Sequence, residues 1–327
     1  MLSRRVDGAR SVRAVPRSTL VAIGNFDGVH VGHQAVIRAA ASEARERGLL
    51  PFVLTFHPHP AQVLGRGGLP ILTTIARKTE LICRIDPDLR VVVEPFTHEL
   101  AAMSPEEFVR ELLIEALGAR VVIIGQNFRF GHNRAGSIET LQALGAELGF
   151  DARAEQLAGD DKGTYSSTRA RELLEAGDLA VLERVLGRPH ALGGTVVEGQ
   201  KRGRTLGFPT ANLSGIAEAL PPHGVYAVLV DLLDESTGRA QVLGRGVANL
   251  GVRPTLGAGA SFEVHVFDID QDLYGRTLRV HLVERLREER RFSDVTALAA
   301  QIARDGERAR EVIAGRSPAP GAEGAWY

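Results

Sequence analysis

The stretch VAIGNFDGVHVGHQAV (residues 21–36) carries the strongest structural signal in this chain. Its apolar start is typical of a strand, and a helix is predicted to begin near Gly32. A loop between the carboxyl end of a strand and the amino end of a helix offers unpaired N–H groups and the positive end of the helix dipole to an anion. Gly28 and Gly32 allow the backbone to approach such a ligand closely. The candidate polar side chains are Asp27, His30 and His33.

The spacing of His30 and His33 leaves four interpretations open: metal ligands, an acid–base pair, a phosphate cradle or a polar turn. Zinc is the main chemical competitor, because His57 and His59 in TFHPHP leave the next strand and complete a set of four. The absence of a nearby cysteine argues against it. These residues alone therefore indicate a polar site without fixing its chemistry.

Outward from this stretch, strand-like and helix-like segments alternate as far as residue 157. The inner strands are apolar throughout, which is typical of parallel strands covered on both faces. One helix carries a capping box from Ser104 to Glu107 and a Gly118 stop. The pattern predicts a doubly wound parallel sheet with ligands at the carboxyl ends of its strands. The predicted strands are 19–24, 50–56, 90–96, 119–125 and 150–157, and the helices are 33–48, 74–85, 104–118 and 136–149.

Beyond two short helical segments, 167–177 and 179–187, the pattern changes at Arg188-Pro189. Strand-like segments then follow one another with glycine and proline between them, which predicts an antiparallel β-barrel. A terminal helix is predicted at about 293–314. We therefore expect an α/β domain over residues 1–186, a barrel domain over 187–315, and a disordered tail over 316–327. The predicted barrel strands are 193–199, 224–233, 241–251, 261–269 and 277–286.

Composition limits the classes of partner. The formal net charge of −1 gives no electrostatic grip on nucleic acid or on an anionic membrane. No apolar run reaches the roughly 18 residues of a membrane-spanning helix. The single cysteine, Cys83, lies on a helical face and is expected to be buried and inert, as suits a reducing cytoplasm. The arginine-rich start is expected to be a short ordered arm rather than a secretory signal.

At this point four motifs in register carry a family resemblance. GNFDGVHVGH (24–33), TFHPHP (55–60), GQNFRFGHNRAG (125–136) and SSTRAR (166–171) resemble the adenylyltransferase module of bacterial bifunctional riboflavin kinase/FAD synthetases. The resemblance implies a nucleotidylyltransferase-like fold in which the phosphate of FMN attacks the α-phosphorus of ATP, giving FAD and pyrophosphate. That nucleophile is already an anion, so no general base is needed, and catalysis depends on positioning and on charge stabilisation.

In this resemblance His30, His33 and Arg171 serve the triphosphate as catalytic groups. Phe56, Phe128 and Phe130 are expected by the flavin, although core packing explains aromatic residues there equally well. Two positions depart from the family pattern, Tyr165 and Ala170, and both leave the charged groups intact. The residues implied to bind nucleotide or flavin are Gly24, Phe26, Asp27, Gly28, Phe56, His59, Asn127, Phe128, Ser167 and Thr168.

The second site is predicted in GGTVVEGQKRGRTLGFPTANL (193–213), a glycine-rich cationic segment without the spacing of a P-loop. Taken alone, PTAN (209–212) fits a capped turn as well as a magnesium site. The whole domain, however, resembles the riboflavin kinase of the same family, which implies transfer of the γ-phosphoryl group of ATP to the 5′-hydroxyl of riboflavin. The matching segments are 193–213, 224–228, 248–255, 261–275 and 285–292.

A neutral alcohol must lose its proton in this second reaction, so a carboxylate is required within reach. The resemblance assigns that role to Glu263, with His265 on the same strand face. Thr210 and Asn212 are implied to hold Mg²⁺ through hard oxygen atoms. The acidic run Asp268, Asp270 and Asp272 lacks the spacing of an EF-hand and is interpreted as a solvated turn. The remaining residues implied to bind substrate or nucleotide are Gly199, Lys201, Gly203, Arg204, Gly207, Pro209, Arg287 and Phe292.

The leading hypothesis is one cytoplasmic chain that phosphorylates riboflavin and then adenylylates FMN. Its ligands are riboflavin, FMN, FAD, ATP and Mg²⁺, with no nucleic acid or membrane partner. One alternative has only the kinase half active, and another is a flavin- or nucleotide-sensing protein without chemistry. Retention of Glu263, which a sensor does not need, argues against the sensor. The sequence leaves open whether the chain is a monomer or a homo-oligomer.

Overall fold

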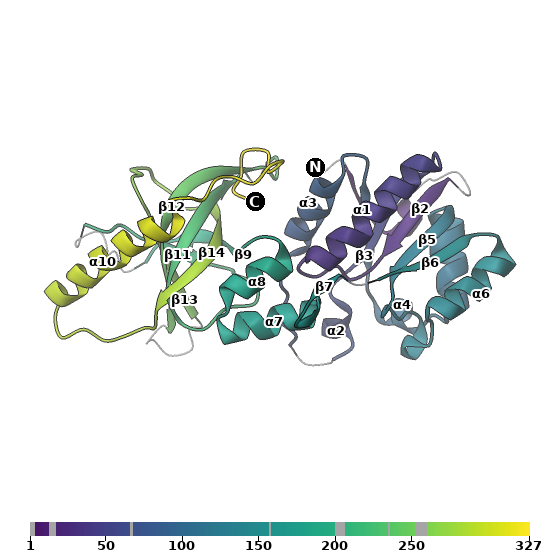
Figure 1. Cartoon of the computed structure of the whole chain (residues 1–327), viewed down its shortest axis with the longest axis horizontal. Coiled ribbons are helices and arrows are strands. Elements are labelled where there is room, and N and C mark those ends of the chain that lie inside the picture. The colour runs from purple at the N-terminus through teal and green to yellow at the C-terminus, as the bar shows by residue number, and fades with distance from the viewer. Residues whose placement is uncertain are drawn as a thin grey trace. The chain divides into compact units, whose positions relative to one another are not determined.

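The computed structural model describes residues 4–12, 18–65, 68–156, 158–199, 207–234, 236–252 and 260–327. The chain forms two compact units, Met1–Ser167 and Thr168–Tyr327, which are described separately below (Figure 1). The division between the units at 167/168 precedes the predicted boundary at 186/187, and the helix Leu179–Leu186 packs on two strands of the barrel, His190–Val197 and Thr277–Arg287. No helix among the described residues is long and apolar enough to cross a membrane.

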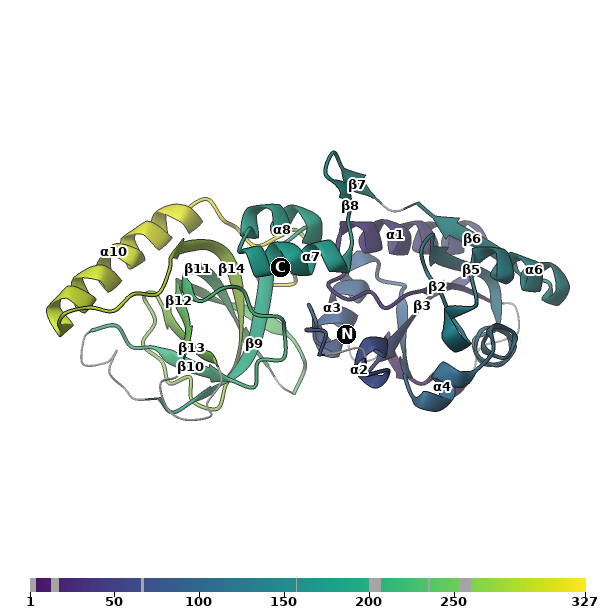
Figure 2. The same ribbon diagram turned by 90° about the horizontal axis from the view of Figure 1, so that it is seen from below.

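The first unit is built on a parallel sheet of six strands in the order β1-β4-β3-β2-β5-β6. The predicted doubly wound α/β fold is confirmed, and helices cover both faces of this sheet (Figures 1 and 2). The strands are β1 (Arg5–Asp7), β2 (Thr19–Ile23), β3 (Leu50–His57), β4 (Arg90–Pro95), β5 (Ala119–Gly125) and β6 (Asp151–Glu155), and a small hairpin is formed by β7 (Gly159–Asp160) and β8 (Gly163–Thr164).

Alternation of side chains along each strand divides the core of this unit into two layers. Leu20 and Ala22 of β2 face the helices α1 (Val31–Glu46) and α3 (Ile75–Ile85), whereas Val21 and Ile23 face the opposite layer, which includes η3 (Phe108–Ala116) and α6 (Ile138–Leu148). Cys83 is buried in the first layer, as expected. The helical segments are η2 (Ala9–Ser11), α1 (Val31–Glu46), α2 (Pro60–Val63), α3 (Ile75–Ile85), α4 (His98–Ala102), α5 (Pro105–Glu107), η3 (Phe108–Ala116), η4 (His132–Arg134) and α6 (Ile138–Leu148).

Two local features of this unit differ from the expectation. The arm before the first predicted strand contains β1, which pairs with β4 at the sheet edge; three residues are too few to give a periodic signal. The predicted helix 104–118 begins with the expected capping box at Ser104 and then continues with π-helical hydrogen bonding from Phe108 onward. That change of winding leaves the predicted apolar face buried.

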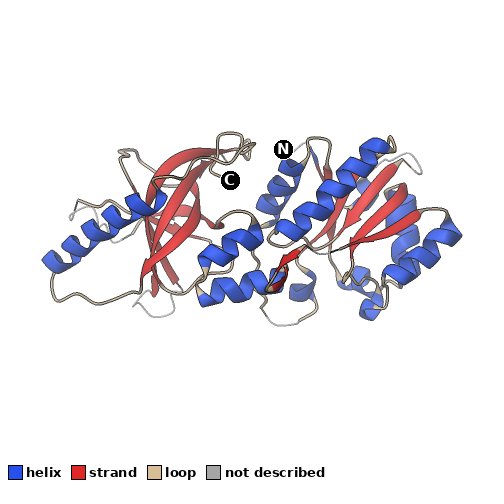
Figure 3. Cartoon of the chain, in the orientation of Figure 1, coloured by secondary structure: helices blue, strands red, loops and turns tan. Residues whose placement is uncertain are grey.

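The second unit is a closed antiparallel barrel in the order β10-β13-β12-β11-β14-β9, with the terminal helix α10 (Val295–Ile313) packed on β11, β12 and β14 (Figure 3). The predicted barrel with a terminal helix is confirmed. Its remaining elements are α7 (Ser167–Ala176), α8 (Leu179–Leu186), β9 (His190–Val197), β10 (Ala211–Ser214), β11 (Gly224–Leu233), β12 (Ala240–Val252), β13 (Ala260–Val266) and β14 (Thr277–Arg287).

The tail that we expected to be disordered packs on the barrel. Trp326 is buried, its backbone N–H donates to Asp231 at 2.9 Å, and its indole N–H donates to the carbonyls of Val230 and Gly244. The composition of 316–327 did not indicate this packing. Burial of the single Trp326 side chain among apolar residues stabilises the tail, although most of its other residues are small and flexible. The tail is therefore part of the folded unit.

Candidate functional site

The loop that follows β2 is held in an unusual backbone conformation. Phe26 and Val29 adopt positive φ values of 47° and 40°, next to Gly28 at 80°. Such values cost energy for residues with a Cβ atom and are concentrated at functional sites. The Phe26 ring covers Gly24 so closely that a Cβ there would lie 2.9 Å from it. Glycine at position 24 is therefore required by packing.

His30 and His33 stand at the start of α1, as predicted. His30 is the N-cap, and its Nδ1 accepts a hydrogen bond from the backbone N–H of His33 at 3.3 Å. The two imidazole rings stack with centroids 3.5 Å apart. Burial holds the pKa of His33 well below its ordinary value, and the charges of His30 and Lys78 lower it further. His33 is therefore neutral at pH 7, and its Nδ1 is a buried atom without a hydrogen-bond partner.

Asp27, predicted to bind nucleotide, has a structural task in this fold. Its buried carboxylate accepts hydrogen bonds from the backbone N–H groups of Leu72 and Thr73 and from the Thr73 hydroxyl. The Thr73 hydroxyl also accepts from the Gly28 N–H at 3.1 Å. Asp27 thus fastens the loop after β2 to the segment that leads into α3.

The distant SSTRAR motif meets the same loop, since the Ser167 hydroxyl donates to the carbonyl of Asp27 at 2.8 Å. Thr168 and Arg171 follow on α7, at the start of the second unit. Ala170, one of the two departures from the family pattern, is fully buried in this helix.

Lys78 is a residue of this region that the sequence prediction missed. It lies on α3, is only 4% exposed, and donates from Nζ to the Asn25 carbonyl at 2.8 Å and to the Thr55 hydroxyl at 3.5 Å. Burial lowers the pKa of Lys78 to about 8, against a smaller opposing effect of Asp27. The available signal was a lysine within the apolar helix TIARKTELICRI (74–85), which resembles any amphipathic helix.

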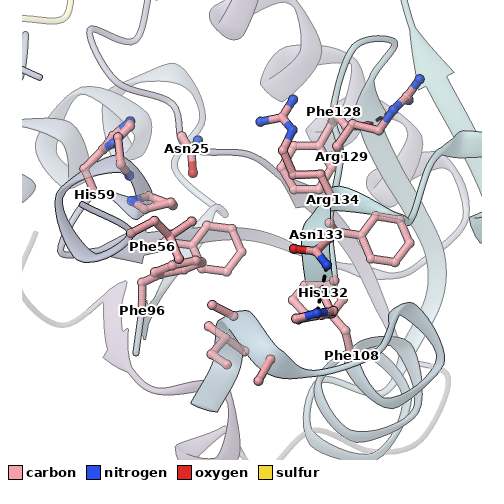
Figure 4. A pocket seen from close by; sticks show the side chains of 18 of the residues that line it. Asn25, Phe56, His59, Phe96, Phe108, Phe128, Arg129, His132, Asn133 and Arg134 are labelled. Carbon is pink, nitrogen blue, oxygen red and sulfur yellow. Dashed lines mark hydrogen bonds between the residues drawn. The ribbon is translucent and has the colours of Figure 1, made fainter. Parts of the chain in front are cut away.

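An aromatic cavity of about 600 Å³ lies beside this loop, at the carboxyl ends of the strands. Asn25, Phe56 and Phe96 face Phe128, His132 and Arg134 across it (Figure 4). The predicted residues Phe56, His59, Asn127 and Phe128 are brought together here. The sequence prediction missed the other lining residues that could make polar contacts, which are Asn25, His98, Arg129, His132, Asn133 and Arg134.

Core packing and cavity lining are combined in the aromatic residues. Phe56 contacts Phe96 and Phe108 at ring centroids 5.9 and 6.4 Å apart, and Phe130 packs on Phe108 at 5.4 Å. Asn133 and Arg134 at the cavity wall take positive φ values of 52° and 60°. Among the described residues no group of three or more His, Cys, Asp or Glu side chains is arranged to hold a metal ion.

In the barrel, three polar residues stand in one row across adjacent strands. Asn212 of β10 and Asn249 of β12 are the register partners of Glu263 on β13. The Thr210 hydroxyl donates to Glu263 Oε2 at 3.5 Å, and the Ser261 hydroxyl donates to Oε1 at 3.4 Å. Asn249 was not predicted, although it lies in the matching segment 248–255.

Two cavities meet at this row. One, of about 530 Å³, lies between the barrel and α10 and is lined by Glu263, Arg287 and Phe292. The other, of about 440 Å³, is lined by Gly199, Pro209 and Asn212. Thr210 lines both cavities. The predicted substrate and metal residues therefore divide between two adjoining spaces with Thr210 at their junction.

Local contacts fix several of these residues. Arg287 is held by Asp305 of α10 through hydrogen bonds of 2.8–3.1 Å, and its guanidinium lies 5.7 Å from the centre of the Phe292 ring. A Cβ at Gly199 would lie 2.2 Å from the Asn212 amide, so glycine is required there. Gly207 takes a φ of 82° in the turn before Pro209. The predicted residues Lys201, Gly203 and Arg204 lie outside the described residues.

The acidic run behaves as a turn at the rim of the second cavity. Asp272 accepts from the backbone N–H of Tyr274 at 3.0 Å, and Asp268 pairs with Arg310 of α10. Asp270 and Asp272 also line the cavity, which the sequence did not indicate.

These features define a class of protein: a two-site transferase, with a nucleotidylyltransferase-type α/β unit and a flavokinase-type barrel in one chain. Residues 12–169 match the family model for FAD synthetase, and residues 186–313 match the model for riboflavin kinase. The chain belongs to the family of bifunctional riboflavin kinases/FMN adenylyltransferases.

Named relatives agree over nearly the full length. The chain is 38% identical over 317 residues to the bifunctional riboflavin kinase/FMN adenylyltransferase of Escherichia coli, covering 96% of this chain and 99% of the relative. The protein with the same name in Bacillus subtilis is 36% identical over 299 residues, covering 89% and 91% of the two chains. A crystal structure described as a macrolide-efflux protein from Streptococcus pneumoniae superimposes with a TM-score of 0.81 at 29% identity, covering 94% of this chain and 99% of the other.

Proposed function

We propose that the barrel transfers the γ-phosphoryl group of ATP to the 5′-hydroxyl of riboflavin at the junction of its two cavities. The observation that carries this proposal is the contact between Thr210 and Glu263, where the space lined by Arg287 and Phe292 meets the space lined by Asn212. Riboflavin occupies the more apolar cavity beneath α10, and the triphosphate occupies the other. The acceptor hydroxyl then lies within reach of the carboxylate of Glu263.

Glu263 acts as the general base in this proposal. The hydroxyls of Thr210 and Ser261 hydrogen-bond its two oxygens and orient the carboxylate. As the 5′-oxygen of riboflavin forms its bond to the γ-phosphorus, Glu263 accepts the proton and ADP leaves with the bonding electrons.

Thr210 and Asn212 fit Mg²⁺, because a hydroxyl and an amide oxygen are the hard ligands this ion prefers. Their positions on the triphosphate side of the junction support the assignment. When bound, Mg²⁺ supplies charge neutralisation for the β- and γ-phosphates. Gly199 leaves room for the Asn212 side chain, and Gly207 and Pro209 shape the turn beside it.

In the first unit, the phosphate of FMN attacks the α-phosphorus of ATP, and pyrophosphate leaves with the electrons of the broken bond. His30 and His33 bind the phosphates, His33 as a neutral imidazole, and the orphaned Nδ1 of His33 supports a ligand there. The sequence resemblance also assigns Thr168 and Arg171 to this reaction. The flavin ring lies in the aromatic cavity with Phe56, His59, Asn127 and Phe128.

The remaining assignments rest on the sequence. From the motifs we place the adenylyltransferase domain at residues 1–186 and the riboflavin kinase domain at 187–315, with the tail 316–327 packed on the kinase barrel, in a cytoplasmic protein whose partners are riboflavin, FMN and ATP. The net charge of −1 supports neither a nucleic acid nor a membrane partner. A homo-oligomer is compatible with these assignments.

One assay tests the whole proposal. The purified chain is incubated with riboflavin, ATP and Mg²⁺, and FMN and FAD are followed by chromatography. We expect FMN first and FAD later, and neither product once Mg²⁺ is chelated. FMN without FAD would leave only the kinase half active, and the absence of both products would favour a sensor.

A further inference from the structure

Lys78 is a buried cation of the first unit that the proposed chemistry does not use, and its ammonium lies against the proposed phosphate loop rather than in an ion pair on its own helix, as the buried guanidinium of Arg77 does with Glu80. Its ammonium lies beneath the loop after β2, against the ends of β2 and β3. The Asn25 carbonyl accepts from Lys78 at 2.8 Å and from the Thr55 hydroxyl at 3.1 Å. Burying an ammonium is costly, so a lysine at this position needs a reason beyond packing.

The contacts of Lys78 connect both halves of the proposed adenylyltransferase site. The side chain of Asn25 lines the aromatic cavity (Figure 4), and its backbone begins the strained loop that leads to His30 and His33. Lys78 therefore touches the one residue that belongs to the cavity wall and to the anion-binding loop. Its charge also adds to the lowering of the pKa of His33, which is caused mainly by burial of that imidazole.

We propose that Lys78 is a positioning residue for adenylyl transfer: it fixes Asn25 at the start of the phosphate loop and places a positive charge beneath the reacting phosphates. The proposal rests on the assignment of FMN adenylylation to this unit. The ammonium has three N–H donors and two acceptors among the described residues. Methionine has a similar length without the charge, and it leaves the bond between Thr55 and Asn25 in place.

The titratable groups that face Lys78 belong to three other segments: Asp27 in the loop, His33 on α1 and His57 at the end of β3. Burial lowers the pKa of both histidines and Lys78 lowers it further, so neither changes charge above pH 7. Asp27 is held by the N–H groups of Leu72 and Thr73. Lys78, with its pKa lowered to about 8, is therefore the member of this group that titrates on the alkaline side.

The test compares Lys78→Met and Lys78→Arg with the wild type in the complete chain, using riboflavin phosphorylation as an internal control. We expect Lys78→Met to lower kcat/KM for conversion of FMN to FAD by about tenfold to a hundredfold, the range for loss of a charged hydrogen bond. Phosphorylation of riboflavin is expected to be unchanged. Arg110→Met removes an exposed cation of the same unit, paired with Glu106 and Glu147, and should leave both activities unchanged.

The pH profile separates charge from packing. In the free enzyme kcat/KM for FAD formation should fall above pH 8 as Lys78 loses its proton, and Lys78→Arg should retain its activity there because a guanidinium does not deprotonate. An alkaline limb that is the same in the wild type and in Lys78→Arg would overturn the proposal.

Stability provides a second, independent readout. The pKa of Lys78 is about 8 in the folded chain and 10.5 in the unfolded chain. Burial of the charged ammonium therefore destabilises the fold fully below pH 8, and this destabilisation decreases as the pH rises from 8 to 10.5. Lys78→Met should therefore melt at a higher temperature than the wild type at pH 7, with a difference that narrows between pH 8 and 10. A lower melting temperature with parallel loss of both activities would show a structural role and overturn the proposal.

The two hypotheses fail in different ways. If FMN adenylylation is not catalysed by this unit, His33→Ala and Lys78→Met will both leave FAD formation intact. If only the role of Lys78 is mistaken, His33→Ala will lower FAD formation by about a hundredfold while Lys78→Met stays within about twofold of the wild type.

Discussion

The two units solve opposite problems with phosphate chemistry. In the α/β unit the attacking phosphate is already charged, and the proposed site holds two stacked histidines, a buried lysine and a strained backbone loop. In the barrel the attacking group is a neutral alcohol, and the proposed site centres on a carboxylate between two cavities. On this proposal, a carboxylate that accepts a proton is needed only where the attacking group is an alcohol.

The largest expected effect concerns that carboxylate. Glu263→Gln keeps the shape of the side chain and removes its basicity, so riboflavin phosphorylation should fall by about a thousandfold. FAD formation from added FMN should be unchanged, as measured by chromatography. Loss of both activities would contradict the separation of the two sites.

The second-largest effect is expected from a substitution in the site of the α/β unit. His33→Ala removes a donor beside the reacting phosphates, so FAD formation should fall by about a hundredfold. Riboflavin phosphorylation in the same sample serves as the control. An equal loss in the kinase assay would argue that the histidine supports folding instead of catalysis.

A smaller effect is expected from the tail. Trp326→Ala should lower the free energy of unfolding of the barrel by about 3 kcal/mol, since it removes a buried indole. The measurement is the urea midpoint for loss of kinase activity, with FAD formation from FMN followed in parallel. A midpoint equal to that of the wild type would show that the tail adds nothing to the barrel.

The smallest effect uses Cys83 as a reporter of the α/β unit alone. The thiol is 2% exposed and burial raises its pKa, so a thiol reagent at pH 7 should react slowly with the folded chain and with one equivalent after unfolding. Trp326→Ala should leave this protection unchanged. Faster labelling in that variant would show that damage to the barrel spreads to the first unit.

Much of the fold could be predicted from local patterns. The near-continuous apolar strands and the helices between them specify a parallel sheet, and the loss of helices after Arg188 specifies the barrel. His30 at the N-cap of α1 and the capping box at Ser104 follow from the same short-range rules. The residues first proposed for the two sites came from motifs, because each motif is contiguous in the chain, whereas Lys78, Asn25 and Asn249 were missed.

The structure added what depends on contacts between distant segments. The carboxylate of Asp27, which is predicted to bind nucleotide, accepts hydrogen bonds from the backbone N–H groups of Leu72 and Thr73. Asn249 lies beside Glu263 because the register of β12 and β13 pairs them. The tail packs on the barrel through contacts that include the hydrogen bond from the Trp326 backbone N–H to Asp231. None of these pairings has a local signature.

The sequence by itself determined the class of each unit and the segments that carry its chemistry, because periodicity and motif spacing are encoded over a few residues. Only the tertiary structure decided the electrostatics of the first site. In the sequence, Lys78 is one polar position on an amphipathic helix. In the fold, its side chain on α3 reaches the ends of β2 and β3. Its ammonium then loses its water and meets the Asn25 carbonyl. Desolvation depends on every neighbour at once, and so it belongs to the fold rather than to any stretch of the chain.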